Sequence, residues 1–309
     1  MNEVRIFAPA SIANISCGFD VLGMCLDNVG DEMVIRKSNK KGIQITKITG
    51  QKLPLETSKN VAGVAGLALL DDLGETHGFE IEIHKKIKAG SGIGSSAASS
   101  AGAVAGINFL LGNPYTNKEL IRFAMEGERL ASGTAHADNV APVLLGGFTL
   151  VRDCSTLDII KLNTPLEIAA SVIHPQIEVK TSDARALLKQ KVPLKKAITQ
   201  WGNLGALVSG LYEEDYELIS RSLEDVIVEP IRSILIPEFD ALKKGCKEAG
   251  ALGSGISGSG PSVFALSKGI FTAHKVADTM KTIYQKTGIE FDTHVSTLNY
   301  EGIKILEYK

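Results

Sequence analysis

The sequence Gly90-Ser91-Gly92-Ile93-Gly94-Ser95-Ser96-Ala97 decides which fold the chain can adopt. It follows residues 79–87, where apolar and polar residues alternate as in a half-buried β-strand. It precedes an alanine- and glycine-rich run that ends near Leu111 and predicts a buried helix. The alternating glycines let the backbone approach a ligand closely, and a helix N-terminus presents unpaired N–H groups and a positive dipole end. We therefore expect an anion-binding turn between a strand and a helix.

Two common nucleotide-binding motifs do not fit this turn. A Walker A loop requires a lysine before its Ser or Thr, and none is present here. The dinucleotide fingerprint places its third glycine one residue later than this sequence does. A tight turn that binds no ligand is the alternative. The hydroxyl groups of Ser95 and Ser96, which could reach a phosphate or a metal ion, favour phosphate binding.

A second glycine loop, at residues 253–261, leads into a strand predicted at 262–266. It is either a strained connection between packed elements or a segment that closes over the same ligand from a second domain. The segment from Ala8 to Asp20 is by itself a polar loop that follows a short strand at Val4 to Phe7.

The segment 126–147 combines Glu128, on a predicted helix, with Asp138 and Asn139 in the loop that follows. A carboxylate near a phosphate loop is a suitable Mg²⁺ ligand, because Mg²⁺ prefers hard oxygen donors and is shared with nucleotide phosphates. A single glutamate is otherwise more often a solvated surface residue. The segment therefore predicts a metal ligand only in combination with the glycine loop.

Composition excludes several classes of protein. The chain of 309 residues has 44% hydrophobic and 22% charged residues, which is typical of a folded globular protein. Its formal net charge of −2 argues against a nucleic-acid-binding protein. The four cysteines show no CxxC pair, so neither a zinc site nor a disulfide framework is expected. Neither a signal peptide nor a membrane span is evident, and we expect a cytoplasmic protein.

The predicted elements mix strands and helices without a regular βαβ repeat, which indicates an α+β fold. Helical patterns cover 60–73, 117–130, 183–188, 195–211, 216–226, 237–248 and 272–286. Further strands are predicted at 33–36, 42–48, 148–151, 167–173 and 290–296. We place a domain boundary near residues 155–165, which gives an N-terminal domain of residues 1–160 and a C-terminal domain of residues 161–309.

The four segments at residues 8–20, 90–97, 126–147 and 253–261, in this order along the chain, resemble the motifs of the superfamily of galactokinase, homoserine kinase, mevalonate kinase and phosphomevalonate kinase. Within it, the run from His136 to Pro142, followed by residues 146–148, is similar to the homoserine kinase branch. So are Asn14 with Gly18-Phe19-Asp20, residues 181–185 and residues 229–232. Small departures from the usual pattern occur at Lys88-Ala89, where a proline is common, at Ile93, and at residues 15–17. The resemblance implies an N-terminal domain like the second domain of ribosomal protein S5 and a ferredoxin-like C-terminal domain, with ATP between them.

The resemblance also implies site residues. The triphosphate of ATP would lie on Lys88, Ala89, Gly90, Ser91, Gly92, Ile93, Gly94, Ser95, Ser96, Ala97 and Ala98. Mg²⁺ would be coordinated by Ser96 and Glu128. The residues expected at the reacting groups are His136, Asp138 and Asn139, with His136 and Thr181 near the γ-phosphate. The homodimer that we expect is likewise implied by the resemblance.

An amino-acid substrate such as L-homoserine presents a carboxylate, an ammonium group and a hydroxyl group. Arg185 and Arg232 are the candidates for the carboxylate, because a guanidinium group matches it with two parallel hydrogen bonds. Asp20 and Asp138 could bind the ammonium group, and Asn14 or Asn139 the hydroxyl group. No side chain stands out as a catalytic base, so direct in-line attack of the hydroxyl on the γ-phosphate is expected.

Three other functions remain open at this point. The chain could be a kinase of the same superfamily that acts on mevalonate or a sugar. It could be a ligand sensor that has kept the fold and lost the activity. A ribosome-associated structural protein with the same N-terminal fold is the third possibility.

Overall fold

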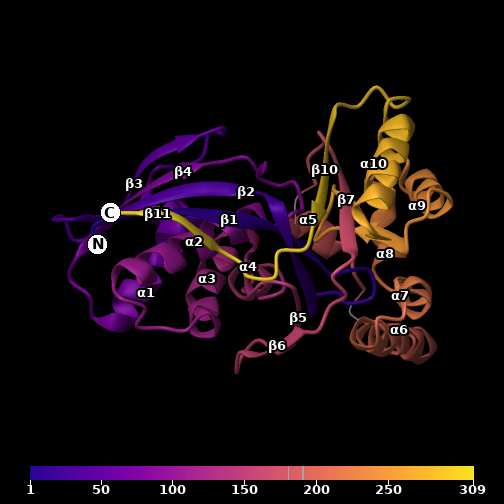
Figure 1. Ribbon diagram of the computed structural model, residues 1–309, viewed down its shortest axis with the longest axis horizontal. Coiled ribbons are helices and arrows are strands. Elements are labelled where there is room, and N and C mark those ends of the chain that lie inside the picture. The colour runs from indigo at the N-terminus through magenta and orange to yellow at the C-terminus, as the bar shows by residue number, and fades with distance from the viewer. Residues whose placement is uncertain (180, 190) are drawn as a thin grey trace.

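The computed structural model describes residues 1–179, 181–189 and 191–309, and for Thr181 and Ser182 it describes the backbone only. Two sheets stand side by side in the long direction of the molecule (Figure 1). The sheet on the left carries most of the N-terminal half of the chain, and the sheet on the right belongs to the C-terminal half. Both chain ends lie on the left-hand sheet.

The first sheet has seven described strands, in the order β11-β1-β2-β4-β3, with β5 paired to β2 and β6 to β5. All pairs are antiparallel except β3 and β4, which are parallel. The bounds are β1 Glu3–Ala13, β2 Leu22–Ser38, β3 Gly42–Thr49, β4 Gly78–His84, β5 Phe148–Asp153, β6 Asp158–Leu162 and β11 Lys304–Tyr308.

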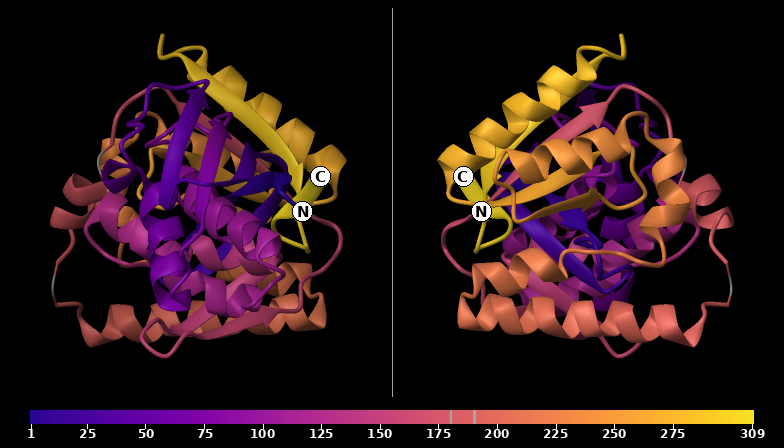
Figure 2. Two further views of the ribbon diagram at one scale, coloured as in Figure 1. Left: turned by 90° about the vertical axis from the view of Figure 1, so that its left-hand side faces the viewer. Right: turned by 90° about the vertical axis from the view of Figure 1, so that its right-hand side faces the viewer.

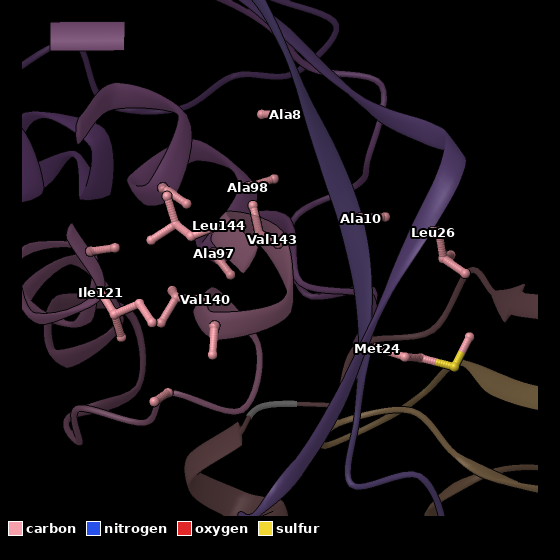
Figure 3. Packing of buried hydrophobic residues seen from close by; sticks show 14 of the residues in the cluster. Ala8, Ala10, Met24, Leu26, Ala97, Ala98, Ile121, Val140, Val143 and Leu144 are labelled. Atoms are coloured by element: carbon pink, nitrogen blue, oxygen red, sulfur yellow. The ribbon is translucent and has the colours of Figure 1, made fainter. Parts of the chain in front are cut away.

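Four helices lie on one face of this sheet: α1 Val61–Leu73, α2 Ser95–Leu110, α3 Asn117–Ser132 and α4 Val140–Leu145. Helices α1, α2 and α4 contact the strands, and α3 packs against these three helices. The small residues of α2 explain its close packing. A Cβ atom added to Gly102 would lie 2.5 Å from Met33 Sδ, and one added to Gly106 would lie 2.5 Å from Ile35 Cδ1. Figure 3 shows alanines of α2 beside side chains of α3 and α4, next to β1. The alanine- and glycine-rich sequence is therefore what brings α2 against β2.

The second sheet is antiparallel, with the order β10-β7-β9-β8. Its strands are β7 Ile168–Pro175, β8 Gly253–Ile256, β9 Val263–Lys268 and β10 Phe291–Thr297. Helix α9, Phe239–Glu248, precedes β8, and α10, Ile270–Tyr284, joins β9 to β10. Strand–helix–strand–strand–helix–strand with this strand order is the ferredoxin-like arrangement. The predicted α+β fold with a ferredoxin-like second unit is confirmed.

Between β7 and α9 the chain inserts a group of helices at the edge of the second unit (Figure 2). They are α5 Thr181–Ala186, α6 Leu194–Glu213, α7 Tyr216–Ser222 and α8 Glu229–Arg232; two short 3-10 helices lie at Thr57–Lys59 and Ser233–Leu235. Among the described residues, no helix is long and apolar enough to cross a membrane.

Two predicted loops are partly wrong. The loop expected from Ala8 is strand as far as Ala13, since β1 continues to pair with β2 through Ser11 opposite Cys25. These residues are buried on both faces, so they lack the alternation that marks a half-exposed strand. The first four residues of the second glycine loop form β8. The division of the chain at residue 160 stays a prediction; β6 ends at Leu162, and β11 returns to pair with β1.

Candidate functional site

A cavity of about 560 Å³ lies between the glycine loop, α3, the loop after β1 and the helices of the second unit. The predicted residues that line it are Asn14, Asp20, Ala89, Gly90, Gly92, Gly94, Ser95, Ser96, Glu128, His136, Asp138, Asn139, Arg185 and Arg232. Ser91, Ile93, Ala97 and Ala98 are buried instead and belong to the support of the loop. Lys88 points elsewhere and donates to Gln176. The side chain of Thr181 lies outside the described residues.

The glycine loop has the backbone that its sequence predicts. Gly90, Gly92 and Gly94 have φ angles of 76°, 85° and 71°, in the left-handed region. A Cβ atom on Gly94 would lie 2.1 Å from Ser11 Oγ, and one on Gly92 would lie 2.7 Å from two backbone carbonyl oxygens of the second glycine loop. Space and φ together therefore require glycine at these positions, and α2 begins directly after them at Ser95.

The second glycine loop supports the first. Ser257 Oγ donates to the carbonyl of Gly92 at 2.7 Å, and the N–H of Ser262 donates to the carbonyl of Ser91 at 3.2 Å. Gly258 and Ser259 also line the cavity. The two halves of the chain are thus hydrogen-bonded to each other at the loop that would hold an anion.

Glu128 of α3 lies beside Ser96, which stands at the start of α2. Burial raises the pKa of the Glu128 carboxyl to about 7, while a hydrogen bond from Ser96 and the charge of Lys85 lower it. Glu128 Oε1 is buried and has no hydrogen-bond partner among the described residues. No cluster of three or more His, Cys, Asp or Glu side chains that could hold a metal exists in the described chain. The Glu128 carboxylate and the Ser96 hydroxyl fit Mg²⁺ as two oxygen ligands, and phosphates and water would complete the coordination shell.

Lys85 and Asp31 form a buried ion pair under the loop that the sequence interpretation missed. Lys85 Nζ donates to Asp31, to the carbonyl of Ser95 at 2.9 Å and to Ser99 Oγ at 3.1 Å. Desolvation lowers the pKa of Lys85, while the charge of Asp31 raises it. One signal was available: Lys85 occupies the inward series of the predicted strand, where Phe79, Ile81 and Ile83 are apolar.

The other end of the cavity carries a cluster of charged side chains. Arg185 donates to both carboxylate oxygens of Asp20 at 2.9 Å and lies 3.0 Å from His136 Nε2. The pKa of His136 is lowered, mainly by burial and also by Arg185, whereas Asp20 raises it. Asp20 and Arg185 were predicted for opposite groups of the substrate, and the structure places them in contact with each other.

Arg232 lies on the buried side of the same cluster. Its guanidinium donates to the carbonyl oxygens of Ala184 at 3.2 Å and Gly258 at 3.3 Å. The Phe19 ring lies 5.0 Å from it and 5.6 Å from the guanidinium of Arg185. Burial and the charge of Arg185 lower the pKa of Arg232. Phe19 belongs to the motif Gly18-Phe19-Asp20 that contributes to the resemblance, but the sequence predicted no role for it.

Asp138 and Asn139 line the cavity between the glycine loop and the two arginines. Burial raises the pKa of Asp138 to about 7, and the charges of Asp20 and Glu128 act in the same direction. Asn139 precedes α4 and accepts a hydrogen bond from Ser11 Oγ at 2.8 Å. Ser11, also not predicted, thereby connects Asn139 with the glycine loop, because its N–H donates to the carbonyl of Ile93.

The loop after β1 is held in an unusual conformation. Asn14, Ile15 and Ser16 all have positive φ angles, of 72°, 41° and 60°. The Asn14 side chain donates to the carbonyl of Gly258 at 2.7 Å and accepts from the N–H of Asp20 at 3.0 Å. Three successive non-glycine residues in this region are costly and are typical of a functional site.

Comparisons with known proteins identify relatives of the whole chain. The N-terminal domain model of the GHMP kinases matches residues 59–147, and the C-terminal model matches residues 207–286. A homoserine kinase of Chloroherpeton thalassium is 45% identical, with 99% of this chain and 100% of that protein covered. A homoserine kinase of Chlorobaculum tepidum is 42% identical, with 99% of both covered.

Solved structures agree with these relatives. The crystal structure of a homoserine kinase from Cytophaga hutchinsonii matches with a TM-score of 0.95 at 52% identity, covering 99% of this chain and 98% of that one. A mevalonate kinase of Methanococcus jannaschii, at 16% identity and a TM-score of 0.69, shares the fold alone. The chain belongs to the homoserine kinase family of the GHMP kinases.

Proposed function

We propose that this chain transfers the γ-phosphate of ATP to the side-chain hydroxyl of L-homoserine, giving O-phospho-L-homoserine for threonine synthesis. The observation that carries the proposal is a single cavity that joins an anion-binding glycine loop at one end to two arginines at the other. An acceptor bound by the arginines and a nucleotide bound by the loop would meet in front of Asp138 and Asn139.

The nucleotide end fits ATP with Mg²⁺. The loop at 88–98 would hold the triphosphate through backbone N–H groups, and Leu53 and Val61 give the same cavity apolar surface for the base. Ser96 and Glu128 would coordinate Mg²⁺, because Glu128 Oε1, next to the Ser96 hydroxyl, is buried without a partner in the part of the chain that the structure describes. Bound Mg²⁺ would neutralise the charge of the β- and γ-phosphates.

The acceptor end fits an amino acid. The substrate carboxylate would bind Arg232 and Arg185, and its ammonium group would bind Asp20 or Asp138. We propose Asn139, fixed by Ser11, as the partner of the reacting hydroxyl, with Asn14 shaping the same wall. His136, whose pKa is lowered by burial and by Arg185, would support the arginine as a neutral imidazole. Thr181 is proposed on the resemblance alone.

The transfer itself is a direct in-line displacement. The hydroxyl oxygen forms a bond to the γ-phosphorus while the bond from this phosphorus to the bridging oxygen of ADP breaks. The hydroxyl proton passes to the transferred phosphoryl group, and positioning and charge stabilisation lower the barrier. A strong solvent isotope effect on kcat, together with a pH–rate pKa that disappears in Asp138→Asn, would instead identify Asp138 as a general base.

The first experiment measures ADP release from Mg-ATP with L-homoserine, mevalonate, galactose or no acceptor. Turnover with homoserine alone is expected. Turnover only with another alcohol would retain the kinase and overturn the assignment of the arginines. ATP binding without turnover on every acceptor would favour a ligand sensor.

We also propose a cytoplasmic homodimer that acts on small molecules and has no nucleic-acid or membrane partner. Four free cysteines in the described chain fit a reducing compartment, and a net charge of −2 offers little attraction to a polyanion. The mass of the purified chain in solution tests the dimer.

A further inference from the structure

Helix α6, Leu194–Glu213, is the longest helix of the inserted group, and little of it is buried. Its buried residues are Leu207, Gly210 and Leu211, on one side of the helix. It runs along the lower border of the molecule in both views of Figure 2, at the edge of the structure. The opposite side of the helix therefore faces away from the core.

This outward side is apolar rather than charged. Leu194, Ile198, Trp201 and Tyr212 are 68%, 51%, 56% and 51% exposed. At 100° per residue these four positions fall within about 60° of one another around the helix. A helix that packs once against its core normally presents charged or polar residues to solvent. Large apolar residues on the outer side instead indicate a second contact.

Small residues occupy the middle of this side. Gly202 and Gly205 lie between Trp201 and Tyr212 along the helix, and no described residue lies within 4 Å of a Cβ atom added to either of them. The fold of the single chain therefore does not require glycine at these two positions. Glycine in mid-helix lowers helix stability, but it lets another helix approach closely at that point.

The two ends of the helix carry opposite charges. Lys195 and Lys196 lie in the first turn, and Glu213 and Glu214 lie at the C-terminal end; all four are exposed. The midpoint of α6 falls between Gly202 and Gly205. If a second α6 packed antiparallel about a two-fold axis at this midpoint, Lys195 of each helix, at the border of the outer side, would lie beside Glu213 of the other.

We propose that the outer side of α6, formed by Leu194, Ile198, Trp201, Gly205 and Tyr212, is the contact surface for a second copy of this chain. The two helices pair antiparallel, with the glycines at the two-fold axis and the lysine and glutamate ends at the rim. The surface is self-complementary, as a two-fold interface must be, and tryptophan and tyrosine are typical of interface centres. This inference rests on the homodimer proposed above and supplies its surface.

The only tryptophan of the chain makes the proposal directly measurable. Sedimentation equilibrium gives the mass across a dilution series, and tryptophan fluorescence is recorded on the same samples. The expected result is twice the chain mass of 32.9 kDa at high concentration. Dilution to the monomer should shift the emission of Trp201 to longer wavelength, with the same midpoint as the mass. Neither measurement depends on catalysis, so a failure here is separate from a failure of the kinase assignment.

Two variants test the geometry. Gly205→Glu should leave the chain folded, because open space surrounds the position, and should weaken dimerisation at least tenfold. Lys195→Glu should weaken the dimer, and adding Glu213→Lys in the same chain should restore it, since both rim contacts are then reversed. Phe271→Glu is the matched control: Phe271 is 88% exposed on α10 and should leave the mass unchanged.

Two results would overturn the proposal. One is a chain that remains monomeric at all concentrations. The other is a dimer that persists in Gly205→Glu with unchanged Trp201 emission, which would show a homodimer assembled through a different surface.

Discussion

Arg232 is almost completely buried, with 3% of its surface exposed, and its hydrogen bonds in the described chain go to neutral carbonyl oxygens. Its positive charge is further opposed by Arg185, which helps to lower its pKa. A buried guanidinium next to a second cation is stabilised by an incoming carboxylate. At the scale of single residues, this makes Arg232 the strongest candidate for substrate recognition.

Arg232→Leu should therefore weaken L-homoserine binding by about 2–5 kcal/mol while ATP binding changes little. Steady-state KM values for the two substrates, with isothermal titration of each, would measure the effect. Arg221→Leu, a change at an exposed arginine of α7, is the control and should alter neither. Equal losses for ATP and homoserine would remove Arg232 from the acceptor site.

Glu128→Gln should raise the Mg²⁺ concentration needed for half-maximal activity, because a neutral amide binds Mg²⁺ more weakly than a carboxylate. The measurement is a Mg²⁺ titration at saturating ATP and homoserine. Glu126→Gln, two residues earlier on the same helix, removes a carboxylate paired with Arg129 at the surface and should have no effect. An unchanged titration in Glu128→Gln would reject Glu128 as a ligand.

The pKa of Asp138 gives a prediction for stability against pH. An unfolded aspartate titrates near 3.9, whereas burial raises the native pKa to about 7. Between these values the native state binds more protons than the unfolded state, so the free energy of unfolding falls as the pH rises from about 4 to 7. The size is roughly 1.4 kcal/mol per pKa unit.

Asp138→Asn removes this titration. Urea unfolding at pH 5 and pH 8 should show a smaller loss of stability in the variant than in the unchanged chain. The same loss in both would mean that Asp138 is ionised in the native state throughout this range. Glu128, whose pKa is also raised to about 7, is present in both proteins and contributes a loss of stability over the same pH range in both.

Single residues differ in how far the sequence predicts them. The glycines of the loop at 90–94 were predictable, because their φ angles and close contacts are local requirements. Ser11 and Phe19 were not, because their roles depend on partners far along the chain, such as Asn139 and Arg232. The contact between Asp20 and Arg185 could not be predicted either, because sequence spacing does not give the distance between two loops.

At the scale of elements, β4, the glycine loop and α2 form a unit that the sequence predicted almost completely. Alternation predicts β4, and the small residues predict a helix packed tightly on a sheet. The sequence did not show that Ser257 of the second glycine loop and Ser262, directly after it, hold the first loop in place. This support depends on the contact between two sheets, which periodicity within one segment does not encode.

Gly92→Ala tests this element-scale contact. Its Cβ atom would lie 2.7 Å from the carbonyl oxygens of both Gly260 and Ser257, at a φ of 85°. The two loops would have to separate, so the KM for ATP should rise at least tenfold. Gly112→Ala has a similar φ of 86° with open space around the Cβ atom, and it should cost only the backbone strain of about 1 kcal/mol. Equal KM values for ATP in the two variants would show that the contact between the loops does not matter.

At the scale of the whole molecule, the acceptor site is assembled from segments that only the complete fold brings together. The loop at 14–20 follows the first strand, and Arg232 ends α8 in the inserted helices. β11 returns from the second unit to pair with β1, so the two units are joined by more than one crossing of the chain. Sequence patterns predicted both units, but not these returns, because such pairings join residues about 300 positions apart.

Gln200, on the inner side of α6, connects the two parts of the acceptor site. Its side-chain amide donates to the carbonyl of Cys17 at 3.0 Å and accepts from the N–H of Val226 at 2.9 Å. One side chain thus links the loop that carries Asp20 to the segment that leads to Arg232.

We expect Gln200→Ala to raise the KM for homoserine several-fold and to leave the KM for ATP unchanged. Asn203→Ala is the matched control, since Asn203, on the same helix, donates to the carbonyl of Glu224 at 2.9 Å. The measurement is the steady-state KM of both variants for homoserine and for ATP under identical conditions. Equal KM values for homoserine in the two variants would mean that α6 supports the fold without positioning the acceptor.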